Sequence, residues 1–232
     1  MTTGVILAGG RSTRFGDADK AVAELAGVPM IRRVADRLAG TGAPAPPGAD
    51  RAGGGDPAVD ELAVSCRTDQ REAVAAALRG VDLPVRWAID EEPDRGPIAG
   101  IGNGCRVATD EYAAVVACDM PFVDPEFVSA LREAASGRDA AVPRLGDRWL
   151  QTTQAVYATE PTAAGCERAL DRGDRRVLAV IDGLDAATVG DDAIRSVTTA
   201  RTFTNVNTRA ELAAAAAAVD GARRDGGAAV DD

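Results

Sequence analysis

Histidine is absent from this chain of 232 residues, and lysine occurs only once, at Lys20, although Lys and Arg together number 26. The absence of histidine excludes Ser-His-Asp and Cys-His catalysis and any zinc site with histidine ligands. Catalysis, if present, must therefore use carboxylates, cations, backbone amides and a metal held by oxygen ligands. The single lysine lies inside a glycine-rich motif, which favours a functional role for it.

Aromatic residues make up only 3% of the chain, and no apolar run approaches the roughly 18 residues that a membrane span needs. The first apolar run is short and no basic segment precedes it, so no secretory signal is predicted. With 46% hydrophobic residues, the chain can still bury a full core of Val, Leu, Ile and Ala. We expect a cytoplasmic protein without membrane segments.

Cysteine pairs with metal-binding or redox spacing are also missing, and the four cysteines are expected to be buried thiols: Cys66, Cys105, Cys118 and Cys166.

The net charge of −10 and the pI of about 4.6 argue against nucleic-acid binding, which requires a basic face. Abundant aspartate with almost no lysine indicates either adaptation to high salt or an acidic protein from a GC-rich genome. The sequence leaves both interpretations open.

Apolar runs of strand length alternate with segments of helical periodicity. Strands are expected at 4–8, 61–65, 84–89, 113–118, 140–143, 154–157, 187–189 and 196–199. Helices are expected at 28–38, 71–79, 96–108, 126–135, 161–170, 175–184 and 209–219. This alternation predicts an α/β fold of Rossmann-like type, a mostly parallel sheet with helices on both faces. Ligands of such sheets bind beyond the carboxyl ends of the strands.

A single domain is predicted over residues 1–219, followed by a polar C-terminal tail at 220–232. Residues 40–60 are rich in Gly, Pro, Ala and Asp and cannot bury enough apolar surface to order themselves. This stretch is predicted to be a mobile insertion. It is not a domain boundary, because a strand follows it directly.

The dominant motif is Leu7-Ala8-Gly9-Gly10-Arg11-Ser12-Thr13-Arg14-Phe15-Gly16, followed by Asp19-Lys20. An apolar strand that leads into Gly9 and Gly10 can bring backbone N–H groups close to an anion, because a missing Cβ lets the backbone approach. Arg11, Arg14 and Lys20 add positive charge suited to a polyphosphate. The spacing fits neither the Gly-x4-Gly-Lys-Ser/Thr loop nor Gly-x-Gly-x-x-Gly.

Two aspartates follow predicted strands at the same edge of the sheet. Asp119 ends a fully apolar strand and precedes Pro121, a placement suited to Mg²⁺, which takes few carboxylates together with substrate phosphates; a helix cap is the alternative. Asp90 precedes the segment Gly96-Pro-Ile-Ala-Gly100 and could accept hydrogen bonds from guanine, or bind metal or ribose. A plain helix start is the competing interpretation of that segment.

These motifs, in this order, resemble the nucleotidyltransferases that activate sugars and cofactors, and among them the molybdenum cofactor guanylyltransferase family. The resemblance covers most of residues 4–219 and extends to Arg148, Gln151 and Phe203-Thr-Asn205-Val-Asn207-Thr208, which is similar to the family's Asn-x-Asn-Thr motif. Thr208 would also suit a helix N-cap. Ser65-Cys66-Arg67 departs from the family, which often has an asparagine there, and Gln151-Thr152-Thr153 replaces a Gln-Pro-Leu-like segment.

The resemblance implies Mg²⁺-dependent transfer of GMP from GTP to the phosphate of molybdopterin, with release of pyrophosphate. It implies the catalytic residues Arg14, Lys20 and Asp119, with Asp119 as the metal ligand. It implies nucleotide binding by Leu7, Ala8, Gly9, Gly10, Lys20, Asp90 and Asp119. It implies acceptor binding by Gln151, Asn205 and Asn207. Molybdoenzyme maturation proteins are the partners that it suggests.

Three alternatives stay open at this point. The enzyme could be a guanylyl- or cytidylyltransferase for another acceptor, such as adenosylcobinamide phosphate or a related molybdopterin. A nucleotide-binding regulatory module could keep the pocket without turnover, although intact Lys20 and Asp119 argue against it. A purely structural or interaction protein would leave the glycine-rich motif unexplained.

Overall fold

The computed structural model describes residues 1–11, 15, 19–41, 56–92, 94–146 and 149–227 of the chain. Two residues that the family resemblance singles out, Arg14 and Arg148, lie outside these ranges. Most of the predicted insertion, at 42–55, lies outside them as well. No helix within the described ranges is long and apolar enough to cross a membrane.

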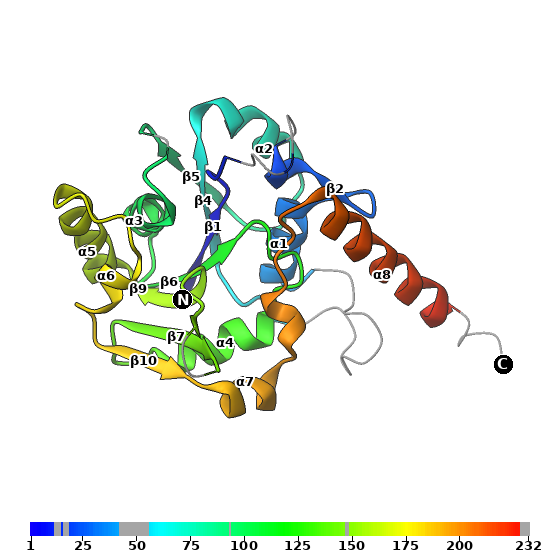
Figure 1. Cartoon of the computed structure of the whole chain (residues 1–232). Helices are drawn as coiled ribbons and strands as arrows, with labels where there is room; N and C mark the ends of the chain where they lie inside the picture. The colour runs from blue at the N-terminus through cyan, green and yellow to red at the C-terminus, as the bar shows by residue number, and fades with distance from the viewer. Residues whose placement is uncertain (12–14, 16–18, 42–55, 93, 147–148, 228–232) are drawn as a thin grey trace.

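A mixed sheet of eight strands forms the centre of the described structure, in the order β10-β7-β9-β6-β1-β4-β5 with β8 paired to β7 (Figure 1). Its strands are β1 Thr2–Leu7, β4 Glu61–Arg67, β5 Val85–Asp90, β6 Tyr112–Ala117, β7 Ala140–Leu145, β8 Trp149–Leu150, β9 Gln154–Ala158 and β10 Ala186–Val189. Neighbours are parallel except at β9, which is antiparallel to β6 and β7, and at β8, antiparallel to β7. The predicted mostly parallel sheet is confirmed. A separate hairpin joins β2 Glu24–Leu25 to β3 Val28–Pro29.

Helices cover both faces of the sheet, as the alternating sequence pattern predicts (Figure 1). One face carries α1 Met30–Leu38, α2 Arg71–Ala77, α4 Pro125–Ala134 and α7 Asp191–Val197. The other carries α3 Pro97–Val107, α5 Thr159–Asp171 and α6 Leu178–Ile181. Helix α8, Arg209–Gly227, extends away from the sheet, and short 3-10 helices lie at η1 Lys20–Val22, η2 Thr68–Gln70 and η3 Ala200–Phe203 (Figure 1).

The two faces divide the strand residues between them. Val5 and Ile6 are neighbours in β1, and both are fully buried, but Ile6 packs with α1 and α4 whereas Val5 packs with α3. Successive side chains of a strand point to opposite faces, so a strand covered on both sides must be apolar throughout. This requirement explains the continuous apolar runs that identify the central strands in the sequence.

Helix α3 lies against β1 because glycine occupies the contact. A Cβ on Gly104 would overlap Cγ1 of Val5, so any larger residue would push the helix off the sheet. Glycine lowers helix propensity by about 1 kcal/mol relative to alanine, and close packing is the physical reason to keep it here. Gly104 therefore serves the packing of α3 against β1.

Four predicted elements differ from the structure. Residues 28–29, predicted to open a helix, form β3, and α1 begins at Met30. Residues 196–199, predicted as a strand, lie at and after the end of α7, where buried Ile194 anchors one helical turn to the core and Asp191 and Asp192 favour a helix start. The helix predicted at 175–184 is shortened to α6. Helix α8 continues to Gly227, past the predicted end at 219, in keeping with its alanine-rich sequence.

The predicted insertion also ends earlier than the expected residue 60. Val59 is buried, and the N–H of Ala58 donates to the carbonyl of Leu38 at 2.9 Å. The N–H of Asp60 donates to the carbonyl of Thr2 at 2.8 Å. These contacts join the segment to α1 and β1 before β4 begins. The four cysteines are buried thiols without disulfides, as expected.

A buried carboxylate fixes the amino-terminal end of the sheet. Glu61 begins β4 and accepts hydrogen bonds from Thr3 Oγ1 at 3.0 Å, Thr109 Oγ1 at 2.7 Å and Arg86 Nε at 2.7 Å. Burial acts to raise the pKa of Glu61, but the hydrogen bonds from Arg86, Thr109 and Thr3 outweigh it and lower the pKa from 4.5 to about 2. The ionised carboxylate therefore ties β1, β4, β5 and the loop after α3 together.

We expect Glu61→Gln to lower the free energy of unfolding by about 1–3 kcal/mol at pH 7, since an amide cannot accept all of these bonds. Because the folded-state pKa of about 2 is below the usual 4.5, the contribution is complete above pH 4.5 and is lost as pH falls towards 2. Urea unfolding of both proteins between pH 7 and pH 3 measures this difference. The exposed Glu72→Gln in α2 is the control. A gap between Glu61→Gln and the parent that stays constant with pH would contradict this account.

Candidate active site

A pocket of about 520 Å³ lies at the carboxyl ends of the central strands. Leu7, Asp90 and Ala117 are the last residues of β1, β5 and β6, and all three line it. The strand ends are level because Leu7 is in register with both Ser65 of β4 and Ala117 of β6. A cavity of this size is typical of small-ligand sites, which commonly lie at this edge of α/β sheets.

The glycine turn after β1 forms one wall of this pocket. Ala8 is buried, and its N–H donates to the carbonyl of Ser65 at 2.8 Å. This hydrogen bond fixes the start of the turn relative to the end of β4. Gly9 and Gly10 both line the pocket, and apart from their chain neighbours no described residue has an atom within 4 Å of where their Cβ atoms would be. The backbone of the turn is therefore open to a ligand, as the sequence predicts.

Three polar side chains from distant parts of the chain meet at the next wall. The Lys20 Nζ atom lies 2.5 Å from Oδ2 of Asp119 and 2.7 Å from Oδ1 of Asn207. The side chains of Lys20 and Asp119 are 15% and 17% exposed, so the ion pair is mostly shielded from water. The other carboxylate oxygen of Asp119, Oδ1, is buried and has no hydrogen-bond partner among the described residues.

A small apolar cluster holds the segments that carry these side chains. Phe15 from the glycine-rich motif packs with Phe122, which follows Asp119, and with Val206, which precedes Asn207. All three apolar side chains are at least nine-tenths buried. The N–H of Val206 also donates to the carbonyl of Asp119 at 2.9 Å. The polar site is therefore assembled on a hydrophobic base that is separate from the two main cores.

The segment Asn205-Val206-Asn207-Thr208 supports a helix start and the site together. Thr208 Oγ1 accepts from the N–H of Glu211 at 3.2 Å, and Glu211 Oε2 accepts from the N–H groups of Asn207 at 2.6 Å and Thr208 at 2.9 Å. This capping arrangement begins α8 and confirms the predicted role of Thr208. It fixes the backbone of Asn207, whose side chain is then directed to Lys20.

Two acidic residues also line the pocket. Asp90 lines the pocket, and burial raises the pKa of its carboxyl above its usual value. Asp94 lies beyond it and pairs with Arg11 of the glycine turn, Nε to Oδ1, at 2.8 Å. The side chains of Arg11 and Asp94 are 59% and 55% exposed, so this second ion pair is open to water.

The sequence profile of the MobA-like NTP transferase domain matches residues 4–189 of this chain. The chain belongs to the MobA-like NTP transferase family. It is thus a nucleotidyltransferase, as the motifs predicted.

Relatives with sequence similarity cover nearly the same length. A protein of Natronomonas pharaonis described as a probable molybdenum cofactor guanylyltransferase is 45% identical over 210 residues, covering 90% of this chain and 94% of the relative. A protein of Haloferax mediterranei with the same description is 38% identical over 219 residues, covering 91% of each chain. The molybdenum cofactor guanylyltransferase of Pseudomonas putida is 32% identical over 190 residues, covering 79% of this chain and 86% of the relative.

Solved structures share the fold. Molybdopterin-guanine dinucleotide biosynthesis protein A from Archaeoglobus fulgidus superposes with a TM-score of 0.71 at 23% identity, covering 95% of this chain and all of the other. The 4-diphosphocytidyl-2C-methyl-D-erythritol synthase from Anaerococcus prevotii superposes with a TM-score of 0.66 at 12% identity, covering 94% of this chain and 98% of the other. At these identities the likeness shows the fold alone.

For this MobA-like protein, most of the residues predicted for the site line the one pocket. They are Leu7, Ala8, Gly9, Gly10, Lys20, Asp90, Asp119 and Asn207. Gln151 and Asn205 do not line it. The N–H of Gln151 donates to the carbonyl of Pro143 at 2.8 Å, and the exposed Asn205 donates through Nδ2 to the carbonyl of Phe203 at 3.3 Å. Their acceptor role stays a prediction, as does the role of Arg14.

Several residues that line the pocket were not predicted from the sequence. Ser65 and Thr153 line the pocket, and both fall in segments where the motif departs from the family pattern. Asp94 is missed because its partner, Arg11, lies 83 residues earlier in the chain. No local pattern signals such a pairing.

The two ion pairs of the pocket should differ in their effect on stability. Replacing Lys20 by Met leaves a shielded carboxylate without its cation, and we expect the free energy of unfolding to fall by about 1–3 kcal/mol. Adding Asp119→Asn to Lys20→Met should recover part of this loss. Arg11→Met removes the cation of the open pair, and its effect should be below about 0.5 kcal/mol.

Urea unfolding of the single and double variants measures the coupling between Lys20 and Asp119. Additive losses from the two single changes would contradict a stabilising contact between them. A loss at Arg11→Met equal to that at Lys20→Met would show that exposure does not separate the two pairs.

Proposed function

We propose that this chain transfers GMP from GTP to the phosphate of molybdopterin and releases pyrophosphate. An oxygen of the acceptor phosphate attacks the α-phosphorus of GTP, and the bond from that phosphorus to the oxygen bridging the α- and β-phosphates breaks. The acceptor phosphate is already ionised at neutral pH, so no histidine or other base has to remove a proton. Such a reaction depends on positioning and on neutralising charge.

The observation that carries this proposal is the meeting of the glycine turn, Lys20 and Asp119 in one pocket. The open backbone at Gly9 and Gly10 suits the oxygens of a polyphosphate, and the ammonium of Lys20 suits the negative charge that develops on the leaving pyrophosphate. The names of the curated relatives support GTP as the nucleotide and molybdopterin as the acceptor.

The chemistry of Asp119 fits a magnesium ion that is shared with the substrate. Its Oδ1 atom has no hydrogen-bond partner among the described residues, and no group of three His, Cys, Asp or Glu within them could hold a metal. A single carboxylate with substrate phosphates is the arrangement that Mg²⁺ prefers. Bound there, the ion would neutralise charge on the phosphates. Lys20 keeps the second oxygen of Asp119 in place through its 2.5 Å contact.

The remaining side chains divide between base and acceptor. Asp90, which lines the pocket, is suited to accept hydrogen bonds from N1–H and N2–H₂ of guanine. Burial raises the pKa of this carboxyl, so donors from a base would satisfy a group that is poorly solvated. Asn207 would face the acceptor beside Lys20. Binding of the acceptor by Asn205 and Gln151 stays a prediction. Transfer of the product to molybdoenzyme maturation proteins stays a prediction.

The direct test measures pyrophosphate release from GTP, CTP and ATP with Mg²⁺, with and without molybdopterin. We expect release only when GTP and molybdopterin are both present. Asp119→Asn should lower kcat/KM by at least about a hundredfold, because it removes the carboxylate that faces the phosphates. Asp182→Asn, an equal charge change at an exposed position, should leave the rate within twofold of the parent.

Several outcomes would overturn parts of this proposal. Release from CTP with molybdopterin would make the enzyme a cytidylyltransferase, and release with adenosylcobinamide phosphate would change the acceptor. If folded protein releases no pyrophosphate from any nucleotide, the result would favour a nucleotide-binding module without turnover. The assay is run at low and high KCl, because the net charge of −10 and the haloarchaeal relatives support adaptation to salt.

A further inference from the structure

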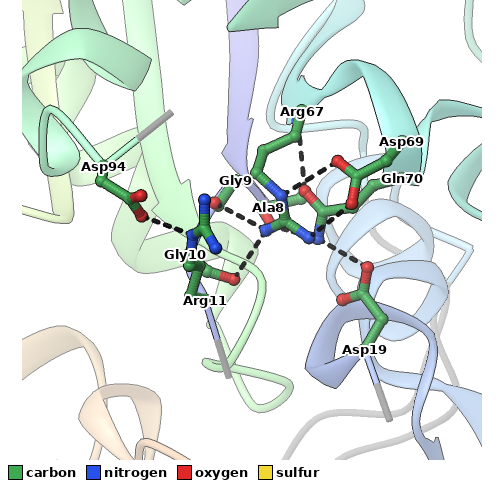
Figure 2. A network of polar contacts seen from close by, with 9 residues as sticks. All are labelled: Ala8, Gly9, Gly10, Arg11, Asp19, Arg67, Asp69, Gln70 and Asp94. Carbon is green, nitrogen blue, oxygen red and sulfur yellow. Dashed lines mark hydrogen bonds and ion pairs between the residues drawn. The ribbon is translucent and has the colours of Figure 1, made fainter. Parts of the chain in front are cut away.

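The carbonyl groups of Ala8, Gly9 and Gly10 are bound by two side chains, one from the end of β4 and one from η2 (Figure 2). Arg67 donates through Nη1 to the carbonyl oxygens of Gly9 at 3.0 Å and Gly10 at 3.1 Å. Gln70 donates through Nε2 to the carbonyl oxygen of Ala8 at 3.1 Å. Three successive peptide groups are thereby held from one side.

This anchoring determines where the N–H groups of the turn point. In a trans peptide the C=O and the following N–H point in opposite directions, and no cis peptide occurs in the described chain. Carbonyls held on the Arg67 side therefore direct the N–H groups of Gly9, Gly10 and Arg11 to the other side. None of these N–H groups donates to an acceptor within the described ranges, and all three residues line the pocket.

The anchoring side chains are themselves fixed. Arg67 forms a two-point pair with Asp69, Nε to Oδ1 at 3.0 Å and Nη2 to Oδ2 at 3.3 Å, and its side chain is only 16% exposed (Figure 2). The backbone N–H of Arg67 donates to Oε1 of Gln70 at 3.1 Å. This contact orients the Gln70 amide, so that its Nε2 faces Ala8.

The same network reaches the residue before the catalytic lysine. Gln70 Nε2 also donates to Oδ2 of Asp19 at 2.6 Å (Figure 2). Oδ1 of Asp19 accepts from the N–H of Ala21 at 3.0 Å. Asp19 thus caps the 3-10 helix η1, whose first residue is Lys20. One set of hydrogen bonds sets the position of the glycine turn and of the segment that carries Lys20.

From this geometry we propose that Arg67 and Gln70 are positioning residues of the polyphosphate site. They hold the carbonyls of the glycine turn away from the pocket, so that its N–H groups face the phosphates of the nucleotide. Neither residue lines the pocket, and both act through the backbone of Ala8, Gly9 and Gly10. Because Asp69 pairs with the guanidinium of Arg67, Arg67 acts on the turn through its hydrogen bonds to the two glycine carbonyls. The inference rests on the proposed function in taking the ligand to be a nucleoside triphosphate.

The test compares binding of GTP and of inorganic tripolyphosphate to the full chain by calorimetry. Arg67→Ala should weaken both ligands by about tenfold, because losing hydrogen bonds from a charged donor frees the turn to rotate its peptides. Arg71→Ala is the matched control, since Arg71 carries the same charge four residues later and contacts the Trp87 ring instead of the turn. Its affinities should stay within twofold of the parent.

Two more variants separate positioning from charge and from folding. Arg67→Lys keeps the charge but loses the forked donor, and it should recover only part of the affinity. Gln70→Met removes the anchor of Ala8 without a charge change and should weaken both ligands several-fold. Hydrogen exchange at the N–H of Ala8, which is hydrogen-bonded to Ser65 where the turn begins, should become faster in Arg67→Ala and stay unchanged in Arg71→Ala. This readout separates local release of the turn from a general loss of stability.

Full recovery by Arg67→Lys, or an equal loss in Arg71→Ala, would overturn the inference in favour of a general charge effect. If Arg67→Ala does not fold, Arg67→Lys and Gln70→Met decide the matter, and unchanged affinity in both would refute it. A parent that binds tripolyphosphate but not GTP would contradict the proposed function and leave the positioning role standing. A parent that binds neither would overturn both.

Discussion

The parallel register of β4, β1 and β6 is the constraint on which the pocket depends. Leu7 pairs with Ser65 on one side and with Ala117 on the other. The N–H of Ala8 donates to Ser65 and the N–H of Cys118 donates to Leu7, so the residues just after the strands stay aligned as well. Leu7, Ser65 and Ala117 line the pocket from this edge. Both faces of these strands are covered and apolar, so polarity does not distinguish them. Residue size does, as the fit of Gly104 against Val5 shows, and a shift by one residue would break such fits.

Polar side chains can meet beyond this edge because apolar contacts bring their segments together first. The cluster around Phe15, Phe122 and Val206 joins stretches almost 200 positions apart in the chain. On this base, Lys20 contacts two acceptors within 2.7 Å, a geometry that suits a compact ammonium. A guanidinium is planar and larger, and its donors are spread over a fork. This difference gives a physical reason for the chain to keep its only lysine here while arginine serves elsewhere.

The parts that could be predicted from the sequence are those with a local signal. Buried parallel strands are continuous apolar runs, so the predicted ends of β1, β4 and β6 lie within two residues of the observed ends. The glycine turn and the strand-end aspartates have motifs of their own. Residues 196–199 were mispredicted because β-branched residues suggested a strand, whereas one buried side chain, Ile194, decides the helix. The anchoring of the turn by Arg67 and the pairing of Arg11 with Asp94 depend on contacts between distant segments, which no local pattern contains.

The central claim is that the α-phosphate of GTP passes to molybdopterin at this pocket. The most direct measurement follows radioactive phosphorus from GTP labelled at either the α- or the γ-position, incubated with the full chain, Mg²⁺ and molybdopterin. The account predicts that α-label appears in the molybdopterin product and that γ-label appears only in pyrophosphate. Transfer of γ-label to the acceptor would show a kinase reaction, and α-label that stays in free nucleotide would show that no guanylyl transfer occurs; either result would contradict the account.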